Sequence, residues 1–510
     1  MKKKNKKLGF HPVMTYIIIM FVIIGLSFIL SLFNTQSTYG IFSTISRDYK
    51  ITSESVLSLL NLRGIKYIFT TTVGNFANFA VLPNLIIILI GIGVMDKSGY
   101  LKTLITILTK KAQKRTVTFV LVFLAIISSI IGDLSFLIFI PLSALIFYYG
   151  KRNPMIGIVS SFAALSVGNG LSLLFTSVDS SLRDITLLNA SVYDPKYHFG
   201  IYAMILINVI LIIAAAFIIT HVTENYIVKK LPKYEFEEEE EEVKIAKKEY
   251  RGLLLASFVG VIYLLIIIYN IIPGLPLSGN LLDYGQTLYI DKLFSYESFF
   301  TLGFVFIVAL LFILLGLFYG IGAKTINNNK DLVDSMSSSL NGIGKTLLLI
   351  FVAASLINIF KQTNIGPTIV AWLSNSIKDS NFTSIPLLIM LFVVSAISTL
   401  VLPRSASKWA IIASTAVPAF MNAGLSPEFS QLIFRLGESV TMGLTPILAS
   451  YVIYLAYIEK YNQDEKPINL FTTIKYQLPY AGLIAGLYIF AIILWYLAGF
   501  PLGIGGYVSI

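Results

Sequence analysis

The sequence predicts an all-α polytopic membrane protein, with nine transmembrane helices and two re-entrant hairpins arranged as an inverted repeat. Hydrophobic residues make up 56% of the 510 residues and charged residues only 13%, which leaves too little polar surface for a soluble protein. The apolar runs have the length of helices and lack the short alternating strands of a membrane barrel. The order of spans and interruptions in the first half of the chain recurs in the second half.

The first region, residues 1–67, is predicted to hold one helix and an outer loop. Five lysines precede an apolar run at about 13–33, which is too long for a signal peptide. We therefore expect a retained helix with a cytoplasmic N-terminus, followed by a polar outer loop at 34–67. The net charge of +11 fits basic cytoplasmic loops, so no nucleic-acid partner is expected.

The first repeat is predicted at 68–224 and begins with a span at about 68–95, whose glycine, asparagine and proline residues indicate a broken helix. Residues 116–150 follow between basic flanks. Two full spans and a turn would need more than ~40 residues, and this stretch is shorter. We therefore expect a re-entrant hairpin with Gly132 and Asp133 at its tip, enclosed by protein or by a water-filled cavity.

The rest of the first half contains two spans and a charged linker. The spans are placed at about 154–180 and 199–222, and two glycines indicate a break in the former. Residues 225–250 are predicted to be a cytoplasmic linker, because the consecutive glutamates Glu237–Glu242 repel one another and stay solvated. Spans 5 and 6 lie in a connecting region at 251–342.

The second repeat, residues 343–510, follows the same order: a span, a surface helix, a hairpin at 383–422, a broken span at about 428–457 and a last span. The motifs "SVGNGLS" (166–172) and "SVTMGLT" (439–445) occupy matching places in the two halves. By the span count, the first copy starts outside the cell and the second inside, as in many secondary transporters. The C-terminus is then expected outside.

Asp133 is the first candidate functional residue, because it is the only charged residue between Thr116 and Gly150. An ionisable residue inside a membrane indicates a functional site by default. Burial would let Asp133 load and release a proton near neutral pH. It could instead bind Na⁺ together with nearby carbonyl groups, or cap a half-helix.

The second hairpin carries polar residues at its tip. Arg404 and Lys408 could attract an anionic substrate, or could be solubilising charges that face an aqueous cavity. Ser405, Ser407 and Thr399 could offer hydroxyl groups to a substrate or to the backbone.

Arg435 and Glu438 are three residues apart, so they share one face of a helix. They could form a buried pair that holds the span in place. Alternatively, Arg435 binds a substrate carboxylate through two parallel hydrogen bonds and Glu438 titrates as it does.

No pattern in the sequence favours an enzyme. The three histidines lie at span ends or in loops, and no nucleophile elbow, HExxH motif or Walker A loop is present. The absence of cysteine excludes disulfides and thiol chemistry. We expect no cofactor and no metal, and energy from an ion gradient.

Several motifs together resemble the AbgT family of bacterial transporters, which is named for p-aminobenzoyl-glutamate. They are "GDLSFLIFIPLSALIF", "SASKWAIIA" and "RLGESVTMGLTPI", and the resemblance covers roughly residues 68–500. It implies nine helices and two opposed hairpins in a homodimer of the inner membrane. It also implies proton-motive-force-driven transport, in either direction, of p-aminobenzoyl-glutamate, folate catabolites or sulfonamides.

The family's functional positions map onto Asp133, Trp409, Pro427 and Arg435, with Glu438 at a further acidic position. The resemblance implies that Trp409 could stack on an aminobenzoyl ring, although a tryptophan in a helix could equally serve in packing.

This sequence departs from the family pattern at four positions, which bear on the substrate and on the coupling ion: Thr399, Arg404, Met442 and Leu174. A sodium-coupled transporter of small carboxylates with the same hairpins is the alternative, and ion replacement in a flux assay separates the two.

Overall fold

The structure is a computed structural model that describes residues 10–43, 48–110, 112–236, 245–295, 297–464 and 466–510. The predicted acidic run at 237–242 therefore lies outside the described residues. Within the described part, nine helices are long and apolar enough to cross a membrane, which agrees with a polytopic helical membrane protein. These helices are Pro12–Leu32, Leu62–Lys97, Lys114–Ile131, Ile205–Lys230, Lys247–Ile271, Phe299–Ala323, Gly344–Gln362, Ser384–Val401 and Leu470–Ala498.

The number nine matches the prediction, but the membership differs. The predicted spans at 154–180 and 428–457 are each divided into two shorter helices. The first is split into α7 (Pro154–Gly168) and α8 (Ser177–Ala190), and the second into α19 (Pro427–Met442) and α20 (Ala449–Lys460). α7 and α19 end within the glycine-containing motifs at 166–172 and 439–445. In place of these two spans, the nine long helices include the first helix of each hairpin, Lys114–Ile131 and Ser384–Val401.

Each predicted hairpin is a pair of helices joined by a short turn. The first pair is α5 (Lys114–Ser128), extended by the 3₁₀ segment η1 (Ser129–Ile131), and α6 (Leu134–Tyr149). Gly132 has a φ of +60° in the turn, a conformation that glycine adopts without strain.

The second pair is α17 (Ser384–Val401) and α18 (Ser405–Asn422), and the residue before Pro403, Leu402, leaves the helical conformation. The helix that follows each pair packs against both of its arms: α7 against α5 and α6, and α19 against α17 and α18.

The order of helices recurs in the two halves. In the first half, α2 (Leu62–Ala77), α3 (Val81–Lys97) and α4 (Tyr100–Thr109) precede the hairpin, and α9 (Ile205–Val222) follows the broken helix. α9 continues through the π-helical segment η2 (Thr223–Ile227) into α10 (Val228–Lys230). In the second half, α15 (Gly344–Gln362) and α16 (Ile365–Asp379) precede the hairpin, and α21 (Leu470–Ala498) comes last. The inverted orientation of the repeats and the re-entrant path of the hairpins stay predictions.

The expectation of an all-α fold was wrong in one place. The predicted outer loop at 34–67 contains β1 (Gln36–Ser43) and β2 (Asp48–Ser55), which pair as antiparallel strands. The sheet lies against α16 and α18, and Asn375 Nδ2 donates to the carbonyl of Thr38 at 3.2 Å. Tertiary contacts of this kind stabilise a two-stranded sheet that would be marginal alone. The local sequence therefore did not predict the two strands.

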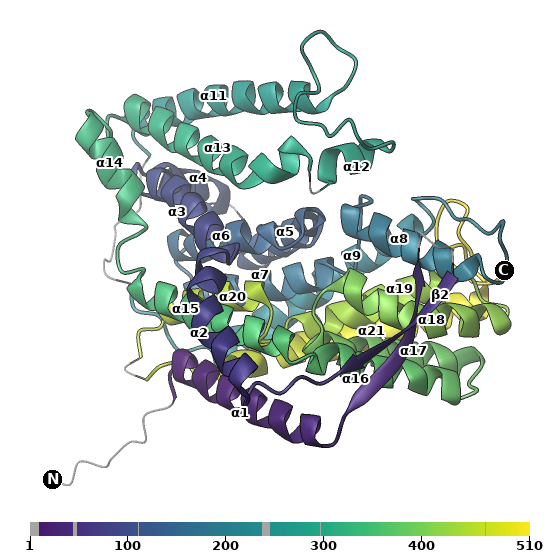
Figure 1. The fold of residues 1–510 in the computed structure, drawn as a ribbon. Coiled ribbons are helices and arrows are strands. Elements are labelled where there is room, and N and C mark those ends of the chain that lie inside the picture. The colour runs from purple at the N-terminus through teal and green to yellow at the C-terminus, as the bar shows by residue number, and fades with distance from the viewer. Residues whose placement is uncertain (1–9, 44–47, 111, 237–244, 296, 465) are drawn as a thin grey trace.

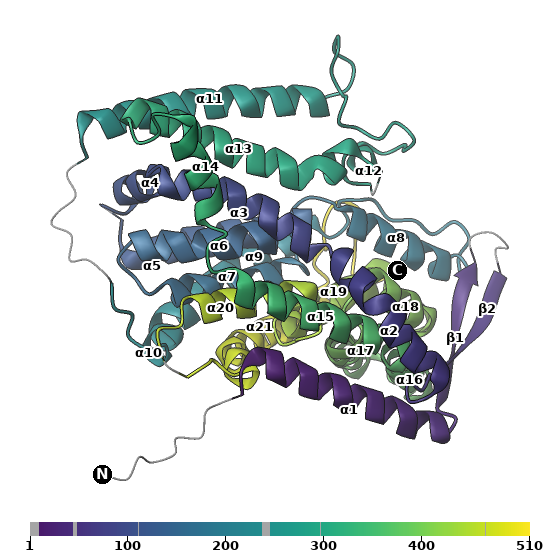
Figure 2. The same cartoon turned by 60° about the vertical axis from the view of Figure 1, so that its left-hand side comes forward.

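The remaining helices form the edges of the molecule. In Figures 1 and 2, α11 (Lys247–Ile271) and α13 (Phe299–Ala323) lie side by side at one edge and α1 (Pro12–Leu32) at the opposite edge. In the chain, the short helix α12 (Tyr289–Phe294) precedes α13 and the short helix α14 (Asn329–Ser338) follows it.

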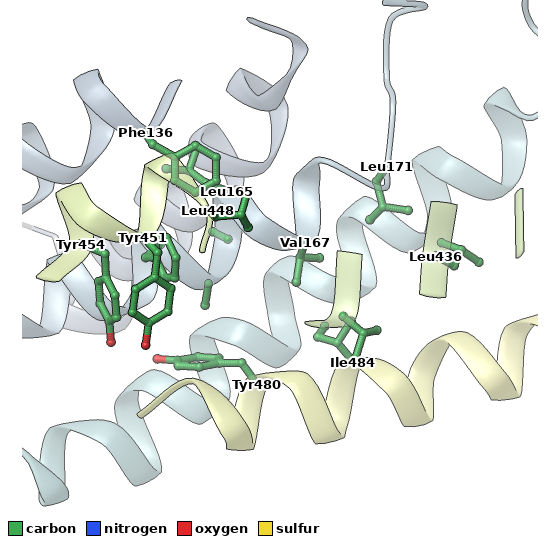
Figure 3. Packing of buried hydrophobic residues seen from close by; sticks show 14 of the residues in the cluster. Phe136, Leu165, Val167, Leu171, Leu436, Leu448, Tyr451, Tyr454, Tyr480 and Ile484 are labelled. Carbon is green, nitrogen blue, oxygen red and sulfur yellow. The ribbon is translucent and has the colours of Figure 1, made fainter. Parts of the chain in front are cut away.

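The core lies around α7 and α19. Every residue of α7 is buried, as are residues 427–440 of α19. Figure 3 shows side chains from α6, α7, α20 and α21 that meet there, among them Phe136 and Tyr454. The ring of Tyr454 stacks on Phe162 at a centroid distance of 4.2 Å. Polar side chains placed along α19 are therefore held by closely packed surroundings.

Candidate functional site

Arg435 and Glu438 lie one turn apart on α19, as their spacing predicts. The Nη1 atom of Arg435 lies 2.6 Å from the Oε1 atom of Glu438. Arg435 is 7% exposed and Glu438 4% exposed. The sequence left open whether these residues pair, and the structure shows that they do.

Lys408 from α18 joins this pair from the side of the second hairpin. Its Nζ atom lies 3.0 Å from Glu438 Oε2 and donates to Thr399 Oγ1 at 2.7 Å. Ser405 donates its hydroxyl to Glu438 Oε1 at 3.0 Å. Lys408 is completely buried, so it is not a solubilising charge in an aqueous cavity. Two cations and one hydroxyl group thus hold the Glu438 carboxylate.

Asp179 is the member of the network that sequence reasoning missed. It lies at the start of α8, where its carboxylate accepts from the backbone N–H and the hydroxyl of Thr176. Its Oδ1 atom is 3.4 Å from Arg435 Nη2. A signal was present: Asp179 falls inside the span predicted at 154–180, where an ionisable residue indicates function, and Thr-x-x-Asp is a helix-capping pattern.

Two acids and two bases therefore alternate through the buried network, and their formal charges cancel. We call Asp179, Arg435, Glu438 and Lys408 the central network. It joins α8, α18 and α19, which come from both halves of the chain. Removing one charge leaves the buried network with a net charge, which is costly in a low-dielectric interior.

Trp409 lies beside the central network in a packed setting. It is completely buried, its Nε1 atom donates to Thr186 Oγ1 at 2.8 Å, and its ring centroid lies 4.5 Å from that of Phe434. Thr186 in turn donates to Gln431 Oε1 at 2.7 Å. The Trp409 side chain thus packs between α8 and α19 in this conformation.

Asp133 is not part of the central network. It occupies the N-cap position of α6, but its side chain makes no capping hydrogen bond, so the capping alternative does not hold. Among the described residues, no cation lies within 4 Å of its carboxylate. Its side chain is exposed, as is that of Arg404 at the N-cap position of α18.

Two further predicted residues lie away from the central network. Ser407 is exposed, and no hydrogen bond joins its side chain to the network in the described structure. Pro427 begins α19, about 12 Å along the helix from Arg435 at ~1.5 Å per residue, next to the Ser426 cap. Two of the residues that depart from the family pattern, Met442 and Leu174, also lie outside the central network. Met442 accepts a hydrogen bond from Asn169 Nδ2 at 3.2 Å, and Leu174 is exposed.

The described residues contain no group of three histidine, aspartate or glutamate side chains arranged to hold a metal ion. The arrangement is instead suited to exchanging one carboxylate for another. A guanidinium and an ammonium group face two acids, so an incoming anion can compete with either acid for its cation.

Comparisons with known proteins give consistent results. The model of the "AbgT putative transporter family" matches residues 4–510. The p-aminobenzoyl-glutamate transport protein of Escherichia coli (strain K12) is 26% identical over 505 residues, which cover 98% of this chain and 94% of that protein.

Two solved structures are also similar. The Alcanivorax borkumensis YdaH transporter, described as having an unusual topology, is 25% identical with a TM-score of 0.48, over 97% of this chain and 100% of that one. Neisseria gonorrhoeae MtrF, said to illuminate a class of antimetabolite efflux pumps, is 29% identical with a TM-score of 0.48, over 97% of each chain.

Proposed function

Because this chain belongs to the AbgT family of transporters, we propose that it is a secondary transporter of p-aminobenzoyl-glutamate or of a related folate catabolite or sulfonamide-like antimetabolite. It is a multi-pass membrane protein and not an enzyme, since the family consists of transporters. In this proposal the proton-motive force drives transport across the bacterial inner membrane, and the working form is a homodimer with inverted repeats.

The observation that carries the proposal is the buried central network at the meeting point of a broken helix and a hairpin. Arg435 presents a planar guanidinium, which suits a substrate carboxylate. In this structure the guanidinium is paired with the carboxylates of Asp179 and Glu438, at N–O distances of 3.4 and 2.6 Å. A substrate carboxylate binds by displacing one of them, and the ammonium of Lys408 receives a second carboxylate.

Proton coupling follows from the same charge balance. A substrate anion that enters a neutral network leaves a net negative charge in a buried site, which is unfavourable. Protonation of Glu438 removes one negative charge, which offsets one of the two substrate carboxylates, and frees Arg435 and Lys408 for the substrate. Proton and anion therefore bind together, and Asp133 at the tip of the first hairpin receives or delivers the proton. Trp409 turns toward the aromatic ring when the packed arrangement opens.

The test is uptake of labelled p-aminobenzoyl-glutamate into proteoliposomes under an imposed pH gradient without sodium. We expect uptake by the wild type and its loss in Glu438→Gln and Asp133→Asn. Glu428→Gln is the matched control, because Glu428 is a buried acid on the same helix outside the central network, where it accepts a hydrogen bond from Tyr197.

The remaining outcomes separate the alternatives. Uptake that requires sodium would reject proton coupling in favour of the sodium-coupled carboxylate transporter. Absence of uptake in both conditions would reject this substrate class. Equal gradient-driven uptake by wild type and Glu438→Gln would remove the coupling role from Glu438.

A further inference from the structure

Two adjoining cavities lie apart from the central network, where α20 ends and α15 begins. Their volumes are about 400 and 320 Å³, and Leu89, Ser339, Tyr457 and Lys460 line both. The surrounding helices are α3, α6, α15 and α20, whose arrangement can be followed in Figure 2. No residue of the central network lines either cavity. The volumes are in the range of small-molecule sites in proteins.

The smaller cavity is lined by tyrosines. They come from the end of α6, the loop after α10 and the end of α20, and are Tyr148, Tyr149, Tyr234, Tyr457 and Tyr461. The rings of Tyr148 and Tyr149 meet edge to face at 5.4 Å. Such rings offer both faces and edges to an aromatic ligand. We call this space the tyrosine cavity.

The charges around the two cavities are mainly unpaired cations. Lys460 lies over the rings of Tyr457 and Tyr461, at 5.6 and 6.0 Å. No carboxylate of the described residues lies within 4 Å of its Nζ atom, or of those of Lys97 and Lys345, which also line the cavities.

The two acids among the lining residues are already engaged. Asp96 accepts from the Tyr149 hydroxyl at 2.5 Å. Glu459 lies 3.9 Å from His11 Nε2 and accepts from the backbone N–H of Ile468 at 3.2 Å. Burial lowers the pKa of Lys460, and Asp96 opposes this effect. An anion at Lys460 would therefore add a favourable interaction to the one that Asp96 already supplies.

We propose that the two cavities form a second binding site, for an aromatic carboxylate. The aromatic ring lies in the tyrosine cavity, its carboxylate contacts Lys460, and a longer acidic tail reaches Lys345 in the larger cavity. The identity of the ligand as p-aminobenzoyl-glutamate rests on the proposed function. Lysine-rich ends of helices are predicted to face the cytoplasm, so this site would collect substrate at that face.

The test measures the labelling of Lys460 by an amine-reactive reagent, followed by mass spectrometry of the detergent-solubilised, full-length protein. p-Aminobenzoyl-glutamate should slow the labelling of Lys460 severalfold, p-aminobenzoate should slow it less, and glutamate without the ring should have little effect. Lys378 is the internal control: it lines a separate cavity beside β1 and α16, and its labelling should not change.

A variant separates binding of the ring from the charge of the lysine. Tyr461→Leu keeps Lys460 but removes one aromatic wall, so protection by p-aminobenzoyl-glutamate should require a severalfold higher concentration. Unchanged labelling of Lys460 with every aromatic carboxylate, or equal protection by glutamate alone, would overturn the proposal. Protection without flux would keep this site and reject the proposed transport function, whereas flux without protection would reject this site alone.

Discussion

Asp179 shows how one side chain links distant parts of the chain. Its carboxylate caps α8 through Thr176 and reaches Arg435 on α19 at 3.4 Å. We expect Asp179→Asn to destabilise the protein by about 1–3 kcal/mol, because a buried partner of a charged group is lost.

The measurement is thermal unfolding in detergent, with Asp184→Asn as the control on the same helix. The side chain of Asp184 is 65% exposed, so its replacement should change the unfolding temperature little. Equal effects of both variants would show that neither the capping hydrogen bonds of Asp179 nor its contact with Arg435 contributes measurably to stability.

Lys408 and Glu438 test the balance of buried charge. Lys408→Met leaves Glu438 with one cation fewer and Glu438→Gln leaves Lys408 without its carboxylate, so each single change should cost about 3–5 kcal/mol. The double variant removes both charges, and its loss should be clearly smaller than the sum of the single losses. A double-mutant cycle of unfolding free energies gives the coupling; additive losses would contradict a direct interaction.

The close contact between the end of α7 and α19 requires a glycine at position 170. A Cβ atom at Gly170, just after α7, would lie 2.5 Å from Ser439 Cβ and 2.6 Å from the carbonyl oxygen of Arg435. We expect Gly170→Ala to cost about 1–3 kcal/mol and to disturb Arg435 through its backbone.

Gly25→Ala in α1 provides the control, since nothing lies within 4 Å of an added Cβ atom there. The helix should accept alanine with a gain of about 0.5–1 kcal/mol. Thermal unfolding and substrate uptake of the two variants check this difference, and a tolerated Gly170→Ala would show that α7 and α19 can separate without cost.

At the scale of the whole molecule, the last residues tie the ends of several helices together. The backbone N–H of Ser426, before α19, donates to Val508, and that of Ile207 in α9 donates to Leu502. Leu502 is completely buried, whereas Ile504 is 72% exposed. Leu502→Ala should therefore destabilise the protein by about 2–5 kcal/mol, and Ile504→Ala should be nearly neutral.

This pair of variants is compared by thermal unfolding in detergent. If both variants unfold at the wild-type temperature, the C-terminal segment contributes no stability to the assembled helices.

The sequence alone determined the class of the protein, because composition and the length of apolar runs follow directly from the cost of placing polar groups in lipid. It also located the helix breaks, since glycine, asparagine and proline act through local backbone geometry. Arg435 and Glu438 were found together for the same reason: three residues on a helix fix their proximity.

Only the tertiary structure decided which distant residues meet. Asp179 and Arg435 are separated by about half of the chain, and no local pattern encodes a contact between α8 and α19. The β1–β2 sheet likewise depends on α16 and α18 for support, and Asp133 was separated from the central network by the packing of the hairpins. These contacts form when buried surfaces from both halves pack around α7 and α19. No single segment of the sequence determines that long-range packing.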